Sequence, residues 1–157
     1  MSTRSSGHGA ATRWLTPEEE RAWRAYRRMV TAVQVRTAQD LAEHGLSEAD
    51  YEVLSTLSER PGSAGPLHEQ AAKMGWSRSR LSRHATRMES RGLLRRDPDP
   101  ADGRGCILVL TPQGLRTLED TAPAHLASVR RHFVDRLTPE DLAALEAIAA
   151  KVDPTGG

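Results

Sequence analysis

Arginine and hydroxyl side chains are concentrated between residues 77 and 91, where five arginines alternate with serines and a threonine. An arginine guanidinium can bind the edge of guanine bidentately or contact phosphate, and a hydroxyl can hydrogen-bond to a base or to the DNA backbone. This combination of side chains indicates a surface that binds nucleic acid. The candidate residues are Ser77, Arg78, Ser79, Arg80, Ser82, Arg83, Thr86 and Arg87.

Helical spacing separates these polar residues from an apolar face. Leu81, Ala85 and Met88 stand at positions i, i+4 and i+7, the spacing of one buried helical face. With about 100° of rotation per residue, the hydroxyl and arginine side chains project from the other side and from the flanks. The pattern predicts a recognition helix for DNA, although a solvated surface helix has a similar composition. The neighbouring segments decide between these two interpretations.

A shorter helix precedes the basic one, and a hairpin follows it. We predict the shorter helix over about residues 68–74, joined to the basic helix by Gly75 and Trp76. Two helices around a tight turn that contains glycine form a helix-turn-helix. After Gly92, residues 93–96 and 106–110 have the composition of strands, and they bracket a polar loop rich in Pro, Asp and Gly. The pair predicts a β-hairpin wing beside the recognition helix.

Longer helices are predicted on both sides of this core. The motif Leu-Thr-Pro at residues 15–17, 110–112 and 137–139 places Thr at a helix N-cap and Pro at the first helical position. Ser47 and Asp50 have the spacing of a capping box, whereas residues 61–66 predict a turn. The predicted helices cover residues 17–43, 47–58, 112–136 with a kink at Pro123, and 139–152. The fold class is mainly α with a small β-hairpin, a winged helix-turn-helix core flanked by long N- and C-terminal helices.

A chain of 157 residues suits one domain. We expect residues 1–12 and 153–157 to be disordered tails, residues 13–152 to form the domain, and residues 47–110 to form its winged core. The flanking helices, residues 17–43 and 112–152, carry narrow apolar stripes that so small a core cannot cover. A homodimer built from these helices is the economical arrangement, and a monomeric helical bundle is the alternative.

Composition and spacing argue against several other classes of protein. The net charge is only +1, so the local arginine cluster, and not the overall charge, points to nucleic acid. A membrane-spanning helix needs about 20 consecutive apolar residues, and no run in the sequence approaches that length. We expect a cytoplasmic protein. Cys106 is the single cysteine, and the six histidines lack metal-ligand spacing, with His84 expected to contact phosphate. No nucleophile with its base, phosphate loop or carboxylate pair indicates an enzyme, and no metal or cofactor is expected.

The order and spacing of these elements over residues 15–152 resemble the MarR family of winged-helix transcriptional regulators. Asp102-Gly-Arg104, followed by Leu-Thr-Pro-Gln-Gly at residues 110–114, is similar to the family's wing pattern, and residues 74–83 and 88–94 are similar to its turn and recognition helix. Gln70 departs from the family, which commonly has an apolar residue there. By resemblance, Arg104 enters the minor groove, where a guanidinium suits the negative potential of A·T-rich DNA. We expect an ion pair with Asp102 to orient Arg104, and the alternative is that Asp102 is an ordinary acidic residue in a turn that favours Asp-Gly.

The resemblance also implies a ligand, because members of the family often bind small phenolic or anionic effectors in a crevice between the dimer helices and the winged core. Trp14, Trp23, Tyr26 and Tyr51 are the candidate contacts for such an aromatic or anionic effector, although aromatic residues at helical spacing also occur as plain core. Cys106 is assigned a packing role. The prediction is a homodimeric repressor that an effector releases from a pseudo-palindromic operator in double-stranded DNA. A winged-helix module that binds protein instead is the alternative.

Overall fold

The computed structural model describes residues 12–153, which fall into two compact units divided within helix α1 (Pro17–Ala42). The first unit ends at Ala32 and the second begins at Val33, and each is described by itself. The tails predicted for residues 1–12 and 153–157 lie outside the described residues, apart from Thr12 and Asp153.

The first unit contains the greater part of α1, which begins at a reciprocal cap. Thr16 Oγ1 accepts a 3.2 Å hydrogen bond from the backbone N–H of Glu19, and Glu19 Oε2 accepts a 2.8 Å bond from that of Thr16. The rings of Trp23 and Tyr26 stack with their centroids 5.6 Å apart, and each of the two residues is 53% exposed. The start of α1 therefore presents aromatic surface to solvent in this chain.

In the second unit, three shorter helices form the helix-turn-helix region: α2 (Glu48–Ser58), α3 (Leu67–Met74) and α4 (Arg78–Ser90). Ser47 and Asp50 form the predicted capping box of α2, and the hydroxyl of Ser77 caps α4 by accepting from Arg80 N at 3.1 Å. Gly75, with φ of 66°, ends α3 in the left-handed conformation, which only glycine adopts without strain. The predicted helix-turn-helix is confirmed.

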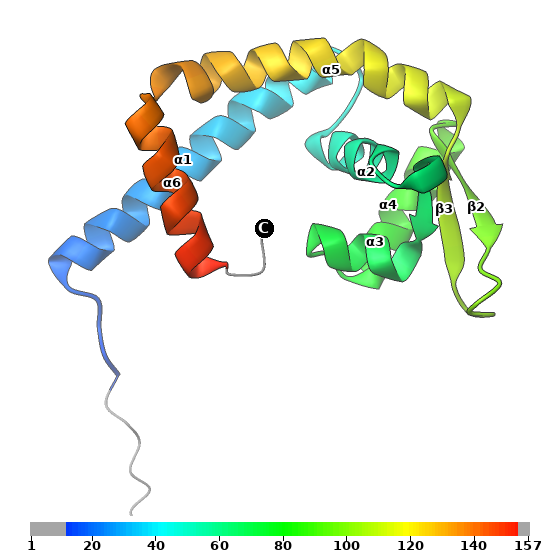
Figure 1. Ribbon diagram of the computed structural model, residues 1–157, viewed down its shortest axis with the longest axis horizontal. Coiled ribbons are helices and arrows are strands. Elements are labelled where there is room, and N and C mark those ends of the chain that lie inside the picture. Colours follow the sequence, from blue (N-terminus) through cyan, green and yellow to red (C-terminus); the bar gives the residue numbers. More distant parts are fainter. Residues whose placement is uncertain (1–11, 154–157) are drawn as a thin grey trace, which may run out of the picture. The chain divides into compact units, whose positions relative to one another are not determined.

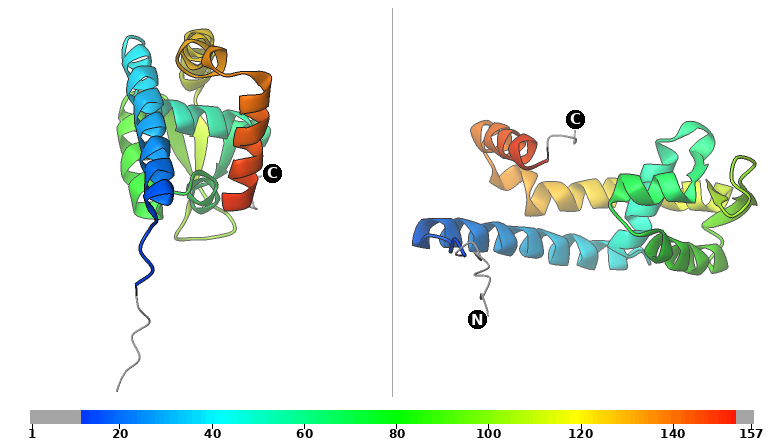
Figure 2. Two further views of the ribbon diagram at one scale, coloured as in Figure 1. Left: turned by 90° about the vertical axis from the view of Figure 1, so that its left-hand side faces the viewer. Right: turned by 90° about the horizontal axis from the view of Figure 1, so that it is seen from below.

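A three-stranded antiparallel sheet completes the winged core, in the order β1 (Ala64–Pro66), β3 (Cys106–Leu110), β2 (Leu94–Pro98). The predicted hairpin of β2 and β3 is confirmed, and its loop extends beyond the strands (Figure 1, Figure 2). The prediction of a simple turn over residues 61–66 is wrong, because a 3₁₀ turn at Pro61–Ser63 leads into β1, with Gly65 opposite Leu108. An edge strand tolerates proline, and three residues are too few for an alternating pattern.

The apolar face of α4 lies in the core as predicted. Leu81, Ala85 and Met88 are all inaccessible to solvent and pack in one cluster with residues of α2 and of the sheet. Gln70 on α3, where the family commonly has an apolar residue, is also fully buried. Its Nε2 donates to the hydroxyl of Thr56 and lies 3.2 Å from the sulfur of Met74, so a polar contact replaces apolar packing there.

Two further helices follow the sheet: α5 (Pro112–His132) and, after a 3₁₀ turn at Val134–Arg136, α6 (Pro139–Val152). Thr111 and Thr138 cap them as the Leu-Thr-Pro motif predicts. The α5 helix ends at His132, four residues before the predicted limit at residue 136, and it continues through Pro123 as one helix. A Cβ at Gly114 would clash with the carbonyl oxygen of Leu93. Glycine therefore lets the first turn of α5 pack directly against the backbone of Leu93, which follows α4.

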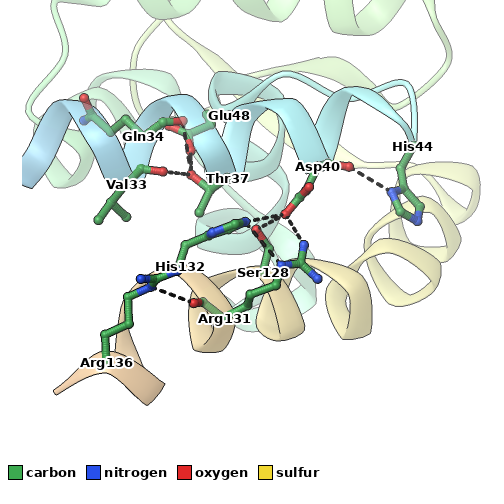
Figure 3. Close-up of polar contacts among 10 residues, drawn as sticks. All are labelled: Val33, Gln34, Thr37, Asp40, His44, Glu48, Ser128, Arg131, His132 and Arg136. Carbon is green, nitrogen blue, oxygen red and sulfur yellow. Dashed lines mark hydrogen bonds and ion pairs between the residues drawn. The ribbon is translucent and has the colours of Figure 1, made fainter. Parts of the chain in front are cut away.

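Asp40, near the end of α1, connects this helix to α5 within the second unit (Figure 3). Its Oδ2 accepts hydrogen bonds from Ser128 Oγ at 2.5 Å and from Arg131 Nη2 at 2.6 Å, and it lies 3.2 Å from His132 Nε2. These contacts, led by the hydrogen bond from Ser128, hold the pKa of Asp40 below its ordinary value. The last turns of α1 are therefore fixed to α5.

Asp50 and the buried His84 connect α2 to α4, which corrects the prediction that His84 contacts phosphate. His84 Nε2 lies 2.9 Å from Asp50 Oδ1, and Arg91 Nη1 donates to Asp50 Oδ2 at 2.8 Å. Burial lowers the pKa of His84, although Asp50 acts in the opposite direction. Burial alone would raise the pKa of Asp50, but the contacts from Arg91 and from the Ser47 backbone N–H hold it below its ordinary value.

Two kinds of feature do not occur in residues 12–153. No helix there is long and apolar enough to cross a membrane. No group of three or more His, Cys, Asp or Glu side chains is placed to hold a metal ion.

Replacing Asp50 should destabilise the protein by more than the loss of a helix cap. Asp50→Ala removes the capping box and leaves His84 and Arg91 without their carboxylate, so the free energy of unfolding should fall by more than about 1 kcal/mol. Urea denaturation followed by circular dichroism measures this change. The control Glu59→Ala removes an exposed ion pair with Lys73 and should cost less than about 1 kcal/mol. Equal, small losses in both variants would contradict the role assigned to Asp50.

Candidate nucleic-acid interface

A hollow of about 640 Å³ lies between α4 and the loop of the hairpin. It brings together six of the residues predicted to contact DNA, four from α4 and two from the loop. Its lining consists of Leu67, His68, Arg78, Ser79, Ser82, Arg83, Asp102, Arg104, Gly105 and Cys106. The recognition helix and the wing tip, which are about 20 residues apart in the sequence, thus share one concave surface.

The arginines around the hollow carry uncompensated charge. Arg78 and Arg83 are exposed on the first two turns of α4, and Arg83 projects from the side opposite the buried Leu81 and Met88. Together with Arg104, they make no ion pair within residues 12–153. A surface with this arrangement attracts anions, because none of these three guanidinium groups is paired with a carboxylate in residues 12–153.

Asp102 organises the wing loop through the backbone. Its Oδ1 accepts a 3.0 Å hydrogen bond from the backbone N–H of Arg104, and its carbonyl accepts a 3.0 Å bond from Gly105 N. The predicted ion pair between Asp102 and the Arg104 side chain is wrong for the described chain, because the carboxylate bonds to the main chain two residues on, as in an Asx turn. In this turn the Arg104 guanidinium makes no ion pair with Asp102.

The other predicted residues of α4 are engaged within the protein. The hydroxyl of Ser77 is the N-cap, and the guanidinium of Arg80 lies 3.7 Å from the centroid of the Trp76 ring. Arg87 Nη2 donates to Nδ1 of His84 at 3.0 Å. These residues and Thr86 do not line the hollow.

Arg96 on β2 contacts α4 beside the hollow, and the sequence did not single it out. Its guanidinium donates to the carbonyl oxygen of Ser82 at 2.6 Å and to the hydroxyl of Thr86 at 3.0 Å. In the sequence Arg95 and Arg96 are adjacent and equivalent, so only the sheet register distinguishes them. Arg95, in contrast, pairs with Asp97 and is exposed.

Tyr51, one of the four candidate effector contacts, lines a separate cavity of about 310 Å³ in the second unit, together with Leu41, Glu48, Glu52, Ser55, Thr56 and His125. The rings of Tyr51 and His125 lie 4.1 Å apart. Burial raises the pKa of Tyr51 and of Glu52 and lowers that of His125. The other candidates, Trp14, Trp23 and Tyr26, belong to the first unit.

Comparisons with known proteins identify relatives of this chain. The MarR family profile matches residues 46–106. The crystal structure of AbsC, a MarR family transcriptional regulator from Streptomyces coelicolor, is 42% identical with a TM-score of 0.85, over 90% of this chain and 95% of AbsC. Sco3205, a MarR family regulator from the same organism crystallised in complex with DNA, is 36% identical with a TM-score of 0.86, over 91% and 90% of the two chains.

The transcriptional regulator HosA of Escherichia coli O111:H- is 33% identical over 96 residues, which are 61% of this chain and 69% of HosA. The similarity to AbsC extends on both sides of the matched residues 46–106 and so includes flanking helices as well as the winged core. The chain belongs to the MarR family of transcriptional regulators.

Proposed function

We propose that this protein binds an operator in double-stranded DNA with sequence specificity and represses transcription from it. The observation that carries the proposal is the hollow between α4 and the wing loop, around which Arg78, Arg83 and Arg104 gather without ion-pair partners in residues 12–153. Duplex DNA is a polyanion with one phosphate charge per about 1.7 Å of its axis, and it suits such a surface. The DNA complex of Sco3205, a relative with the same fold, supports this assignment.

In this proposal, α4 enters the major groove and Arg104 reaches the adjacent minor groove. The first turns of a recognition helix contact base edges in winged and other helix-turn-helix proteins. Arg78, Ser79, Ser82 and Arg83 occupy these turns and line the hollow. The remaining candidates on α4, namely Ser77, Arg80, Thr86 and Arg87, are assigned to the edge of the same interface, and Asp102 to the shape of the loop.

A second copy of the chain is the proposed partner of the terminal helices. On α6, Ile148 is 55% and Val152 is 82% exposed, and no residue of that helix is buried in the described chain. Leu126 on α5 is 60% exposed. A two-fold dimer would cover these apolar side chains and place two copies of α4 in symmetric relation, as a pseudo-palindromic operator requires.

A winged-helix module that binds protein is the competing function. It would use the same hollow for an acidic peptide segment. The serine hydroxyls between the arginines favour DNA, because they add base-edge contacts to the charge.

The proposal predicts a salt-sensitive dimer on DNA. Fluorescence anisotropy with the DNA upstream of the chain's own gene should show binding that exceeds that of a scrambled duplex, and the affinity should fall steeply with salt because several arginines displace counterions. Light scattering after size exclusion should give the mass of a dimer at micromolar concentration. A monomer, or binding indifferent to salt and sequence, would refute the proposal.

Removing one arginine of the hollow should weaken DNA binding without unfolding the protein. Arg104→Ala and Arg83→Ala should each cost about 1–3 kcal/mol in operator affinity, the range of one groove contact. The control is Arg130→Ala on α5, which removes the same charge from an exposed ion pair with Asp135. This variant should leave the affinity within about twofold. Wild-type affinity in both hollow variants would favour the protein-binding alternative.

Release from the operator is proposed to depend on a small aromatic effector in the cavity beside Tyr51. An effector can release DNA only if it binds the DNA-incompetent arrangement more tightly. Tyr51 and His125 supply an aromatic wall. Glu48 accepts a hydrogen bond from Thr37, and Glu52 makes no ion pair in residues 12–153, so the two carboxylates favour a neutral or cationic ligand over an anion. Trp14, Trp23 and Tyr26 stay predictions for additional contacts.

Two nearly isosteric ligands of opposite charge test the effector site. Benzamidine should bind more tightly than benzoate in isothermal titration calorimetry, and it should lower operator affinity by a factor of about 5–150, the usual range of allosteric coupling. Glu52→Gln should weaken benzamidine binding, whereas the control Glu43→Gln removes an equal charge outside the cavity and should not. Tighter binding of benzoate would contradict the proposed ligand class.

A further inference from the structure

Arg96 connects the wing to the recognition helix through three hydrogen bonds. From β2, its Nη2 donates to the carbonyl oxygen of Ser82 at 2.6 Å and to the Ser82 hydroxyl at 3.2 Å, and its Nη1 donates to the Thr86 hydroxyl at 3.0 Å. The backbone N–H of Arg96 also donates to Glu89 Oε2 at 3.1 Å. The Arg96 side chain is only 25% exposed, so one guanidinium is held firmly against two successive turns of α4.

These hydrogen bonds determine which donor and acceptor sites of the Ser82 and Thr86 hydroxyls remain unoccupied. A hydroxyl has one proton to donate and two acceptor sites. Thr86 donates its proton to the carbonyl of Ser82 at 3.1 Å and accepts from Arg96, so it keeps only one acceptor site. The hydroxyl of Ser82 accepts from Arg96, and its proton has no acceptor in the described residues. Ser82 also lines the hollow, so it presents a free donor there.

Arg96 has an acidic neighbour within the protein. Glu89 Oε1 lies 3.9 Å from its Nη1, whereas Arg78, Arg83 and Arg104 make no ion pair in residues 12–153. A partly buried guanidinium that is paired and donates to three oxygens is poorly placed to bind phosphate as well. The geometry of Arg96 therefore fits a role in orienting other side chains better than a role in contacting DNA directly.

We propose that Arg96 is a positioning residue, which fixes Ser82 as a hydrogen-bond donor and thereby sets a preference for a base-pair acceptor in the major groove. The inference rests on the proposed function, because it assumes that α4 reads DNA. The acceptors of the required kind are purine N7, guanine O6 and thymine O4, whereas the amino groups of adenine and cytosine do not fit a donor. Arg96 itself carries no base contact in this account.

The test compares Arg96→Met with Arg95→Met, which removes an equal charge from the neighbouring exposed position, and with Ser82→Ala. Affinities are measured by anisotropy for a panel of operators in which each base pair of the half-site is replaced in turn. Ser82→Ala and Arg96→Met should both reduce the preference at one and the same position, by about threefold to tenfold, the value of one hydrogen bond. In the double variant the preference should be no lower than in Ser82→Ala alone. Arg96→Lys should not restore it, because an ammonium lacks the planar fork.

Other readouts separate positioning from two alternatives. The slope of affinity against salt should be the same for Arg96→Met and the wild type, whereas a decrease of about one would identify Arg96 as a phosphate contact and overturn the inference. A uniform loss of affinity at every position, with a lower melting temperature, would mean a merely structural role and would also overturn it. So would a base preference in Arg96→Met equal to that of Arg95→Met. Lack of any base preference in the wild type would instead refute the proposed function, and the inference with it.

Discussion

The structure depends on how a helix with a basic outer face is held in place. Leu81, Ala85 and Met88 anchor α4 in the apolar core, and all three are inaccessible to solvent. Polar contacts add to this packing at several points along the helix: Asp50 contacts His84 and Arg91, and Arg96 donates to the Ser82 carbonyl. Removing one partner of a buried charge pair is costly, because the other charge is left buried without compensation. The outer face of α4 is therefore oriented by apolar packing and by these polar contacts together.

Ion pairing and position together distinguish the arginines of the hollow from those that connect segments within the protein. Arg91 and Arg96 have carboxylate partners and are used inside the protein. Arg78, Arg83 and Arg104 have none in the described residues, and all three surround the same hollow. An isolated uncompensated charge on a surface means little, but several that converge from two elements are repulsive unless a polyanion neutralises them. This convergence distinguishes the hollow from the rest of a chain whose net charge is only +1.

Much of this organisation could be predicted from the sequence, because it depends on local rules. Helical periodicity identified the buried face of α4, and the Leu-Thr-Pro motif located three helix starts. The errors concern contacts between segments that are distant in sequence, or choices between alternative partners that the sequence does not distinguish. The strand β1 exists only because β3 pairs with it, and nothing in three residues indicates that pairing. Asp102 bonds to the Arg104 backbone instead of its guanidinium, and Arg96 differs from Arg95 only through the register of β2.

The positions of Asp50 and Tyr51 suggest how the cavity and the recognition helix are mechanically related. These residues are adjacent on the first turn of α2; Tyr51 lines the cavity, and Asp50 binds His84 and Arg91 of α4. The cavity is also lined by Leu41, one residue after Asp40, whose carboxylate fixes α1 to Ser128 of α5. A ligand that displaced α2 would therefore also act on the contacts of Asp50 with His84 and Arg91. Under the proposed effector mechanism, α2 is thus the element through which binding at the cavity changes the presentation of α4, and no long chain of contacts is required.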